Sequence, residues 1–301
     1  MTPRVLAVLG PTAAGKTRAA IQVAQRVDGE VISLDSMQAY RGMDIGTATP
    51  SVEEREGVPH HMFDIWPIEH PTTVVDFRDA ARAAIEDVWA RGRIPIAVGG
   101  SGLYVRAVLE TLDPPGTDPD VRAALEERLS DIGARALHEE LARVDPAAAE
   151  AIAATNGRRI VRALEVNAIT GDPFQAHLPR PEDRYATMRV GIAIDRGSLD
   201  ERISLRVEEM WRRGFVNEVR DLMGQGLAQS PTARAALGYE PVMTFLTGAI
   251  TEDQAREQTI ADTRKFARRQ QRWFSGDPRI HWVEFDEPSL VDEVAGFVTR
   301  R

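Results

Sequence analysis

The chain has 301 residues, of which 43% are hydrophobic and 28% are charged, as in an ordinary globular protein that can bury a sizeable core. No apolar run is long enough to span a membrane and the first residues do not form a signal peptide, so a cytoplasmic protein is expected. The absence of cysteine excludes disulfides and thiolate metal sites, and the net charge of −9 argues against a protein coated in nucleic acid.

The first third of the chain alternates between predicted strands and predicted helices. Short apolar runs predict buried strands at 4–9, 30–35 and 93–98, and helical spacing predicts helices at 18–27 and 74–91. This alternation is typical of an α/β fold in which helices flank a parallel sheet on both faces.

A second region contains only predicted helices. They are broken by glycine and proline and cover 119–131, 134–144, 146–154 and 158–170. A strand at 188–194 and helices at 198–224 and 252–275 follow. The chain is therefore expected to form an α/β core from 1–115 and 186–301, with an all-helical insertion domain at 116–185.

Residues 10–17 have the sequence and the context of a P-loop, because a predicted strand precedes them and a predicted helix follows. Backbone N–H groups of such a loop turn inward around phosphate oxygens. The chain has only two lysines, and Lys16 stands where a P-loop needs a point charge, while Thr17 can ligate Mg²⁺. The predicted diphosphate-binding residues are Gly10, Pro11, Thr12, Ala13, Ala14, Gly15, Lys16 and Thr17, and a chance glycine turn is the alternative.

A carboxylate, Asp35, ends the second predicted strand. Since ligands of open α/β sheets bind at the carboxyl ends of the strands, Asp35 should face the same crevice as the P-loop. It could act there as a general base, help to hold Mg²⁺, or simply cap a loop. The turn at 99–102 is rich in glycine, which allows close approach of a ligand or of another packed segment.

Two groups of arginines carry alternative interpretations. Arg202 and Arg206 share one helix face and could clamp a diphosphate, or pair with Glu208 and Glu209. The segment 256–272 holds six basic and two acidic residues, with a stripe formed by Arg264, Arg268 and Arg272. This face predicts a nucleic-acid backbone as partner, unless acids elsewhere in the chain pair with it.

Adjacent histidines at 60 and 61, with Asp64, do not predict a metal site. Their side chains point in different directions, and no third nitrogen ligand lies at suitable spacing.

Several blocks of sequence, in order from residue 4 to about 275, resemble those of the bacterial tRNA dimethylallyltransferases. They are 10–17, 35–48, 58–61, 98–104, 159–165, Gly238-Tyr239 and 263–270. The Asp-Ser-Met-Gln-Ala-Tyr-Arg block at 35–41 and the Arg-Ala-Leu-Glu block at 162–165 are far more specific than the P-loop.

The resemblance implies transfer of a dimethylallyl group from its diphosphate to N6 of the adenosine 3′-adjacent to the tRNA anticodon, with Mg²⁺ as cofactor and a monomeric enzyme. By the same resemblance, Asp35 is the general base, and Thr12 and Arg206 belong to the reaction centre. The implied tRNA contacts are Asp35, Ser36, Met37, Gln38, Ser101, Arg159, Ile160, Val161, Arg162, Ala163, Gly238 and Tyr239, with the stripe Arg264, Arg268 and Arg272. A small-molecule or nucleoside P-loop kinase, a prenyltransferase of free adenine nucleotides and a catalytically silent RNA- or nucleotide-binding module are the alternatives.

Overall fold

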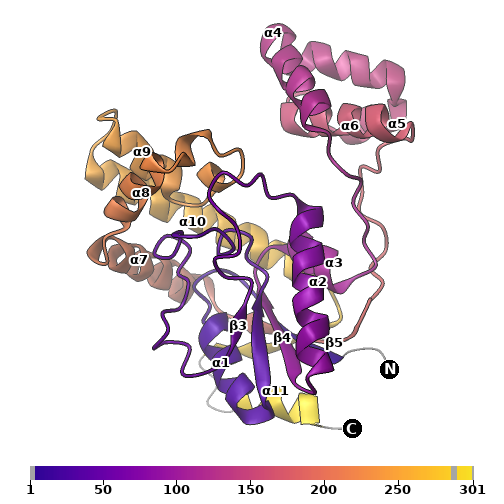
Figure 1. Ribbon diagram of the computed structural model, residues 1–301. Helices are drawn as coiled ribbons and strands as arrows, with labels where there is room; N and C mark the ends of the chain where they lie inside the picture. The colour runs from indigo at the N-terminus through magenta and orange to yellow at the C-terminus, as the bar shows by residue number, and fades with distance from the viewer. Residues whose placement is uncertain (1–3, 286–289, 300–301) are drawn as a thin grey trace. The chain divides into compact units, whose positions relative to one another are not determined.

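The computed structural model describes residues 4–285 and 290–299, which divide into two compact units (Figure 1). The core unit contains the described residues up to Thr111 and from Asp183 onward, and the helical unit spans Leu112–Glu182. The expected boundaries at 115/116 and 185/186 lie a few residues beyond these points.

A parallel sheet of six strands, in the order β3-β2-β4-β1-β5-β6, forms the centre of the core unit. Its strands are β1 (Arg4–Leu9), β2 (Gly29–Ser33), β3 (His60–His61), β4 (Ile94–Gly99), β5 (Ala186–Ala193) and β6 (Ile280–Glu284). The α/β class predicted from the sequence is thus confirmed, with β3 and β6 as strands that the sequence did not predict.

Alternate residues of β1 enter two different hydrophobic cores, as the two-residue repeat of a strand requires. Leu6 and Val8 pack with helices on one face, and Val5, Ala7 and Leu9 pack with helices on the other. The first face is covered by α1 (Lys16–Val27), α7 (Arg196–Arg212), α10 (Glu252–Ser275) and α11 (Leu290–Thr299). The second is covered by α2 (Val74–Ala90) and α3 (Gly102–Leu109).

A third core joins the segment after β2 to the helices that follow α7. Tyr40 and Met43 are fully buried against Phe215 of α8 (Phe215–Gly224) and Tyr239 of α9 (Tyr239–Leu246). Short 3₁₀ turns at Leu227–Gln229 and Ala233–Ala235 complete this part of the chain.

The prediction of a single helix over 198–224 is wrong. Gly214 adopts φ 96°, a left-handed conformation that glycine reaches without strain, and it separates α7 from α8. By contrast, α10 has the predicted bounds, because Thr251 and Gln254 form a capping box at its start.

The helical unit has its own core and contains α4 (Pro119–Val144), α5 (Pro146–Ala151) and α6 (Gly157–Thr170). Non-helical backbone at Gly133 interrupts α4, in agreement with the two helices expected there. The fully buried Glu165 accepts hydrogen bonds from Arg122, Arg162 and the backbone N–H of Asp118. The Arg-Ala-Leu-Glu block therefore contains an internal ion pair of this unit.

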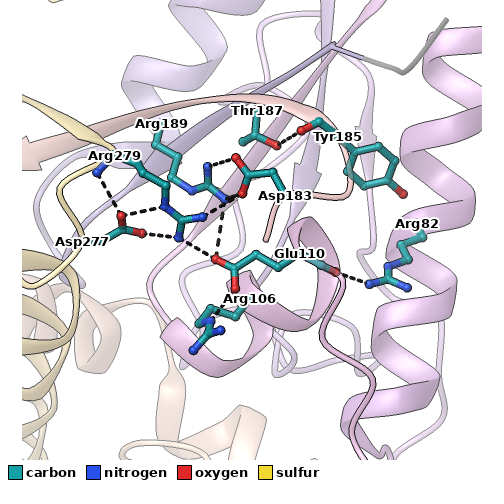
Figure 2. Close-up of polar contacts among 9 residues, drawn as sticks. All are labelled: Arg82, Arg106, Glu110, Asp183, Tyr185, Thr187, Arg189, Asp277 and Arg279. Carbon is teal, nitrogen blue, oxygen red and sulfur yellow. Dashed lines mark hydrogen bonds and ion pairs between the residues drawn. The ribbon is translucent and has the colours of Figure 1, made fainter. Parts of the chain in front are cut away.

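An ionic network lies at the two points where the chain leaves and re-enters the core unit (Figure 2). Glu110 and Asp183 form an antiparallel bridge, and the buried guanidinium of Arg189 pairs with Asp183 and lies 3.7 Å from Glu110. Arg279 reaches both carboxylates, at 2.6 Å and 2.8 Å, and also pairs with Asp277. The chain is thereby attached at both points, through Glu110 and Asp183, to β5 and to the residues just before β6.

Candidate active site at the carboxyl edge of the sheet

Three neighbouring strands of the core unit deliver the predicted site residues to one edge. The P-loop follows β1, Asp35 follows β2 and the turn with Ser101 follows β4. Because β4 lies between β1 and β2 in a parallel sheet, all three segments emerge at the same carboxyl edge.

The P-loop ends in the N-terminus of α1. Lys16 is the first residue of that helix, and its Nζ donates a hydrogen bond to the carbonyl of Pro11 at 2.7 Å. Helix N-terminal N–H groups and a lysine on one loop form a site for a diphosphate. Lys16 and the next residue, Thr17, are both half-buried.

The charge of Lys16 is sensitive to its surroundings. Burial, together with the nearby Arg206, lowers the pKa of Lys16 from 10.5 to about 7, and Asp35 opposes this change. An added anionic ligand would favour the protonated form, since an opposite charge stabilises an ammonium group.

Asp35 is open to solvent, as a base for an incoming substrate must be. Its Oδ1 accepts a hydrogen bond from the N–H of Met37 at 3.0 Å, so the loop-capping role is present as well. Desolvation by the surrounding protein raises the pKa of Asp35, while Lys16 and Arg206 counteract this change. The three groups therefore lie close enough to act on one another's charge.

Both arginines of the α7 face reach the P-loop. Arg206 Nη1 donates to Thr12 Oγ1 at 3.2 Å, and Arg202 Nε donates to the carbonyl of Ala13 at 2.8 Å. The acids that offered the alternative are engaged elsewhere: Glu209 pairs with Arg212, and Glu208 lies 3.7 Å from Arg256. The face of α7 thus points to the phosphate site.

The block after Asp35 is divided between the surface and the interior. Ser36 is buried, whereas Met37, Gln38 and Ser101 are half-buried. The Gln38 side chain is fixed, because its Oε1 accepts from Ser33 Oγ at 2.6 Å and its Nε2 donates to the carbonyl of Thr47 at 3.2 Å. Contacts of this block with RNA stay a prediction.

Other predicted RNA contacts do not present their side chains at the surface. Ile160, Val161 and Ala163 are buried in the helical unit, and Gly238 and Tyr239 are buried in the third core. Helix packing thus occupies the side chains of Ile160, Val161, Ala163 and Tyr239, and contacts of these segments with RNA stay a prediction. Arg159 is exposed and donates to the carbonyl of Ala176, and Arg162 donates to the carbonyls of Pro115 and Gly116 as well as to Glu165.

Only part of the basic stripe of α10 lacks a partner of opposite charge among the described residues. Arg264 Nη2 donates to the carbonyl of Asp200 and to Ser204 Oγ, and its Nε lies 3.7 Å from the Asp200 carboxylate. Lys265 pairs with Asp262 at 3.0 Å. Arg268 and Arg272 form no ion pair within the described ranges 4–285 and 290–299, so the uncompensated part of the stripe begins one turn later than expected.

A glutamine of α10 that the sequence analysis did not single out contacts the P-loop. Gln270 is 7% exposed, and its Oε1 accepts a hydrogen bond from the N–H of Thr12 at 2.8 Å. A Cβ on Gly100 would lie 2.3 Å from Gln270 Nε2 and 3.0 Å from the carbonyl oxygen of Gly10, so Gln270 would have to shift. The only signal in the sequence was a polar side chain among the small or apolar residues on the buried face of α10.

Among the described residues, no group of three histidine, aspartate or glutamate side chains could hold a metal ion. His61 instead bonds Glu30 at 2.6 Å, and His60 Nδ1 bonds the carbonyl of Val58 at 2.8 Å. Thr17, in the first turn of α1, is the residue that could ligate a Mg²⁺ ion bound together with a diphosphate.

The family model described as IPP transferase matches residues 38–277. The chain belongs to the IPP transferase family. The resemblance found in the sequence is thereby confirmed, and with it the assignment of the chain as a transferase.

Curated members of the IPP transferase family resemble the chain along nearly its whole length. The tRNA dimethylallyltransferase of Thermobifida fusca is 53% identical over 299 residues, covering 98% of this chain and 94% of the relative. That of Salinispora arenicola is 55% identical over 287 residues, covering 95% and 84%.

Solved structures of the family share the fold. The full-length tRNA isopentenylpyrophosphate transferase of Bacillus halodurans is 37% identical with a TM-score of 0.72, over 99% of this chain and 96% of its own. A eukaryotic dimethylallyltransferase solved in the act of modifying tRNA is 26% identical with a TM-score of 0.80, over 99% and 77%. The P-loop-like sheet with flanking helices is thus the fold of the family.

No helix in the described part of the chain combines the length and the apolarity needed to cross a membrane.

Proposed function

We propose that the chain transfers the dimethylallyl group of dimethylallyl diphosphate to N6 of the adenosine 3′-adjacent to a tRNA anticodon, with release of diphosphate. The observation that carries this proposal is the convergence of Lys16, Arg206 and Asp35 at one edge of the sheet, where the P-loop follows β1, Asp35 follows β2 and Arg206 bonds Thr12 of the P-loop. Two cations suit a leaving diphosphate, and a carboxylate suits the proton of an acceptor amine. The family's named activities agree with this chemistry.

The residues of this chain divide the reaction between them. Lys16, the loop N–H groups and Arg206 hold the diphosphate, whose charge increases as the bond between its oxygen and C1 of the dimethylallyl group breaks. N6 of adenine forms the new bond to C1 and loses a proton, which Asp35 accepts. Thr12 orients Arg206 through its hydroxyl. One dimethylallyl group, one proton and one diphosphate are accounted for.

Magnesium belongs to the proposal as cofactor, held by Thr17 and the phosphate oxygens of the donor. When bound, it neutralises part of the charge of the leaving diphosphate.

The acceptor side of the site is proposed to include the block at 35–38, in which Asp35 is exposed, together with Ser101 and with Arg268 and Arg272 of α10. An adenine can reach a carboxylate in such a crevice only if it leaves the base stack, which is easiest in a single-stranded loop. We also propose, from the resemblance to the family, that the enzyme acts in the cytoplasm and as a monomer.

The proposal is tested by identifying what is released. Protein, Mg²⁺ and dimethylallyl diphosphate should release diphosphate only when an anticodon stem-loop is present. Release that requires AMP instead of RNA would indicate a prenyltransferase of free nucleotides. Consumption of ATP with phosphoryl transfer to a small acceptor would indicate a kinase, and both results would contradict the proposal.

A further inference from the structure

A glutamate of α8 that no sequence motif singled out holds the backbone of the 44–46 loop. Glu218 Oε2 accepts hydrogen bonds from the N–H groups of Asp44 and Ile45, at 3.0 Å and 2.6 Å. Its Oε1 accepts from the N–H of Gly46 at 3.0 Å and from the hydroxyl of Tyr239 at 2.8 Å. Hydrogen bonds to a carboxylate are stronger than neutral ones, so four of them fix this loop firmly.

The aromatic rings beside Glu218 press on the same loop. A Cβ on Gly46 would lie 2.4 Å from Phe215 and 2.5 Å from Tyr239, and these two rings pack edge to face with centroids 5.0 Å apart. Burial, with Glu218 nearby, holds the pKa of Tyr239 well above its ordinary value, so its hydroxyl stays a donor. Gly46, Tyr239 and Glu218 thus form one packed unit.

The residue after this loop contacts the phosphate site. The carbonyl of Thr47 accepts from Arg206 Nη2 at 3.3 Å and from Gln38 Nε2 at 3.2 Å. Arg206 is therefore held between two protein groups, the Thr47 carbonyl and the Thr12 hydroxyl. A shift of the 44–47 backbone would move one of its two anchors.

We propose that Glu218 is a positioning residue for the diphosphate site, which acts by fixing the 44–47 segment and, through the Thr47 carbonyl, the guanidinium of Arg206. The inference rests on the proposed role of Arg206 in holding the diphosphate. It also gives Tyr239 a function that needs no RNA contact, since its hydroxyl completes the set of hydrogen-bond donors around Glu218.

The test measures affinity for dimethylallyl diphosphate with Mg²⁺ by calorimetry, without RNA. Glu218→Gln keeps the size of the side chain but turns an NH₂ group toward the backbone N–H groups of the loop. We expect the affinity for dimethylallyl diphosphate to fall about tenfold. Tyr239→Phe removes one hydrogen bond to Glu218 and leaves the three from backbone N–H groups. We therefore expect a smaller loss of affinity for dimethylallyl diphosphate, about threefold.

Val242→Ala is the matched control, because Val242 is fully buried in the same core cluster. It should lower the melting temperature and leave donor affinity unchanged. Wild-type affinity in Glu218→Gln, or equal weakening in Val242→Ala, would overturn the inference. Since the measurement contains no RNA, a wild-type protein that binds the donor but modifies no tRNA would contradict the proposed function alone.

Discussion

Lys16 and Asp35 have pKa values displaced toward each other. The pKa of Lys16 falls to about 7 through burial, and that of Asp35 rises through desolvation. Catalytic sites commonly show such opposed shifts, because each group must have the right charge at the working pH. The proposed chemistry requires Lys16 protonated and Asp35 ionised.

The pH dependence of kcat/KM for dimethylallyl diphosphate should therefore be bell-shaped. It should fall on the acid side as Asp35 takes up a proton, at a pH above the ordinary range of aspartate. It should fall on the basic side as Lys16 loses its proton, near pH 7 in the free enzyme. The basic limb of kcat should lie at higher pH, because a bound diphosphate stabilises the ammonium group. A kcat/KM profile flat up to pH 9 would contradict the role of Lys16.

Asp35→Asn should lower single-turnover transfer by roughly two to four orders of magnitude, the usual contribution of a general base. The amide can still accept the hydrogen bond from Met37, so the loop should keep its conformation. Stem-loop affinity should change little, and this is the control measurement. Near-normal transfer rates in the variant would exclude Asp35 as the base.

At the scale of elements, α10 serves both parts of the site. Gln270 holds the P-loop at Thr12, while Arg268 and Arg272 stand one turn apart with no ion pair among the described residues. Arg264, another turn away, is engaged by Asp200 and Ser204 of α7. Only the later part of the stripe is therefore available to a phosphate backbone.

Neutralising Arg268 and Arg272 should flatten the salt dependence of stem-loop binding by about one slope unit for each lost phosphate contact. Arg264→Gln is the matched control and should leave the slope unchanged, because its guanidinium already has partners in α7. Affinity would be measured by fluorescence anisotropy between 50 and 200 mM salt, roughly the range over which phosphate contacts dominate. An unchanged slope in the double variant would identify the stripe as a solvated face.

Strands and helices with a local sequence signal were predicted correctly. The strand and the helix break that lack such a signal were missed, for physical reasons. The strands at 4–9 and 93–98 and the helix α10 follow from apolar periodicity and a capping box. The strand β3 has only two residues, too few for any periodicity, and the break at Gly214 depends on one left-handed residue. The roles of Gln270 and Glu218 depend on partners 258 and about 170 residues away, which no local pattern encodes.

At the scale of the whole molecule, the P-loop and the Asp35 block were predictable because motif and strand context coincide. The helical region was predictable from its continuous helical spacing. The ionic network that joins Glu110 and Asp183 was not, because its members come from three segments that are far apart in the sequence (Figure 2).

Arg189→Met should destabilise the core unit by about 3 kcal/mol, because removal of one partner leaves buried carboxylate charge less compensated. The control is Arg184→Gln, which breaks an exposed pair with Glu86 and should cost less than about 1 kcal/mol. All five tryptophans lie in the core unit, so urea denaturation followed by their fluorescence reports this unit alone. Equal losses in the two variants would contradict a stabilising role of the network.

The most direct measurement combines the protein, Mg²⁺, radiolabelled dimethylallyl diphosphate and an unmodified anticodon stem-loop that carries adenosine 3′ of the anticodon. We expect label in this RNA, and none when that adenosine is replaced by guanosine. Label in both RNAs would contradict transfer to that N6 amine. Absence of label from RNA, with transfer to AMP or consumption of ATP, would show that the P-loop binds phosphates but the acceptor is not tRNA.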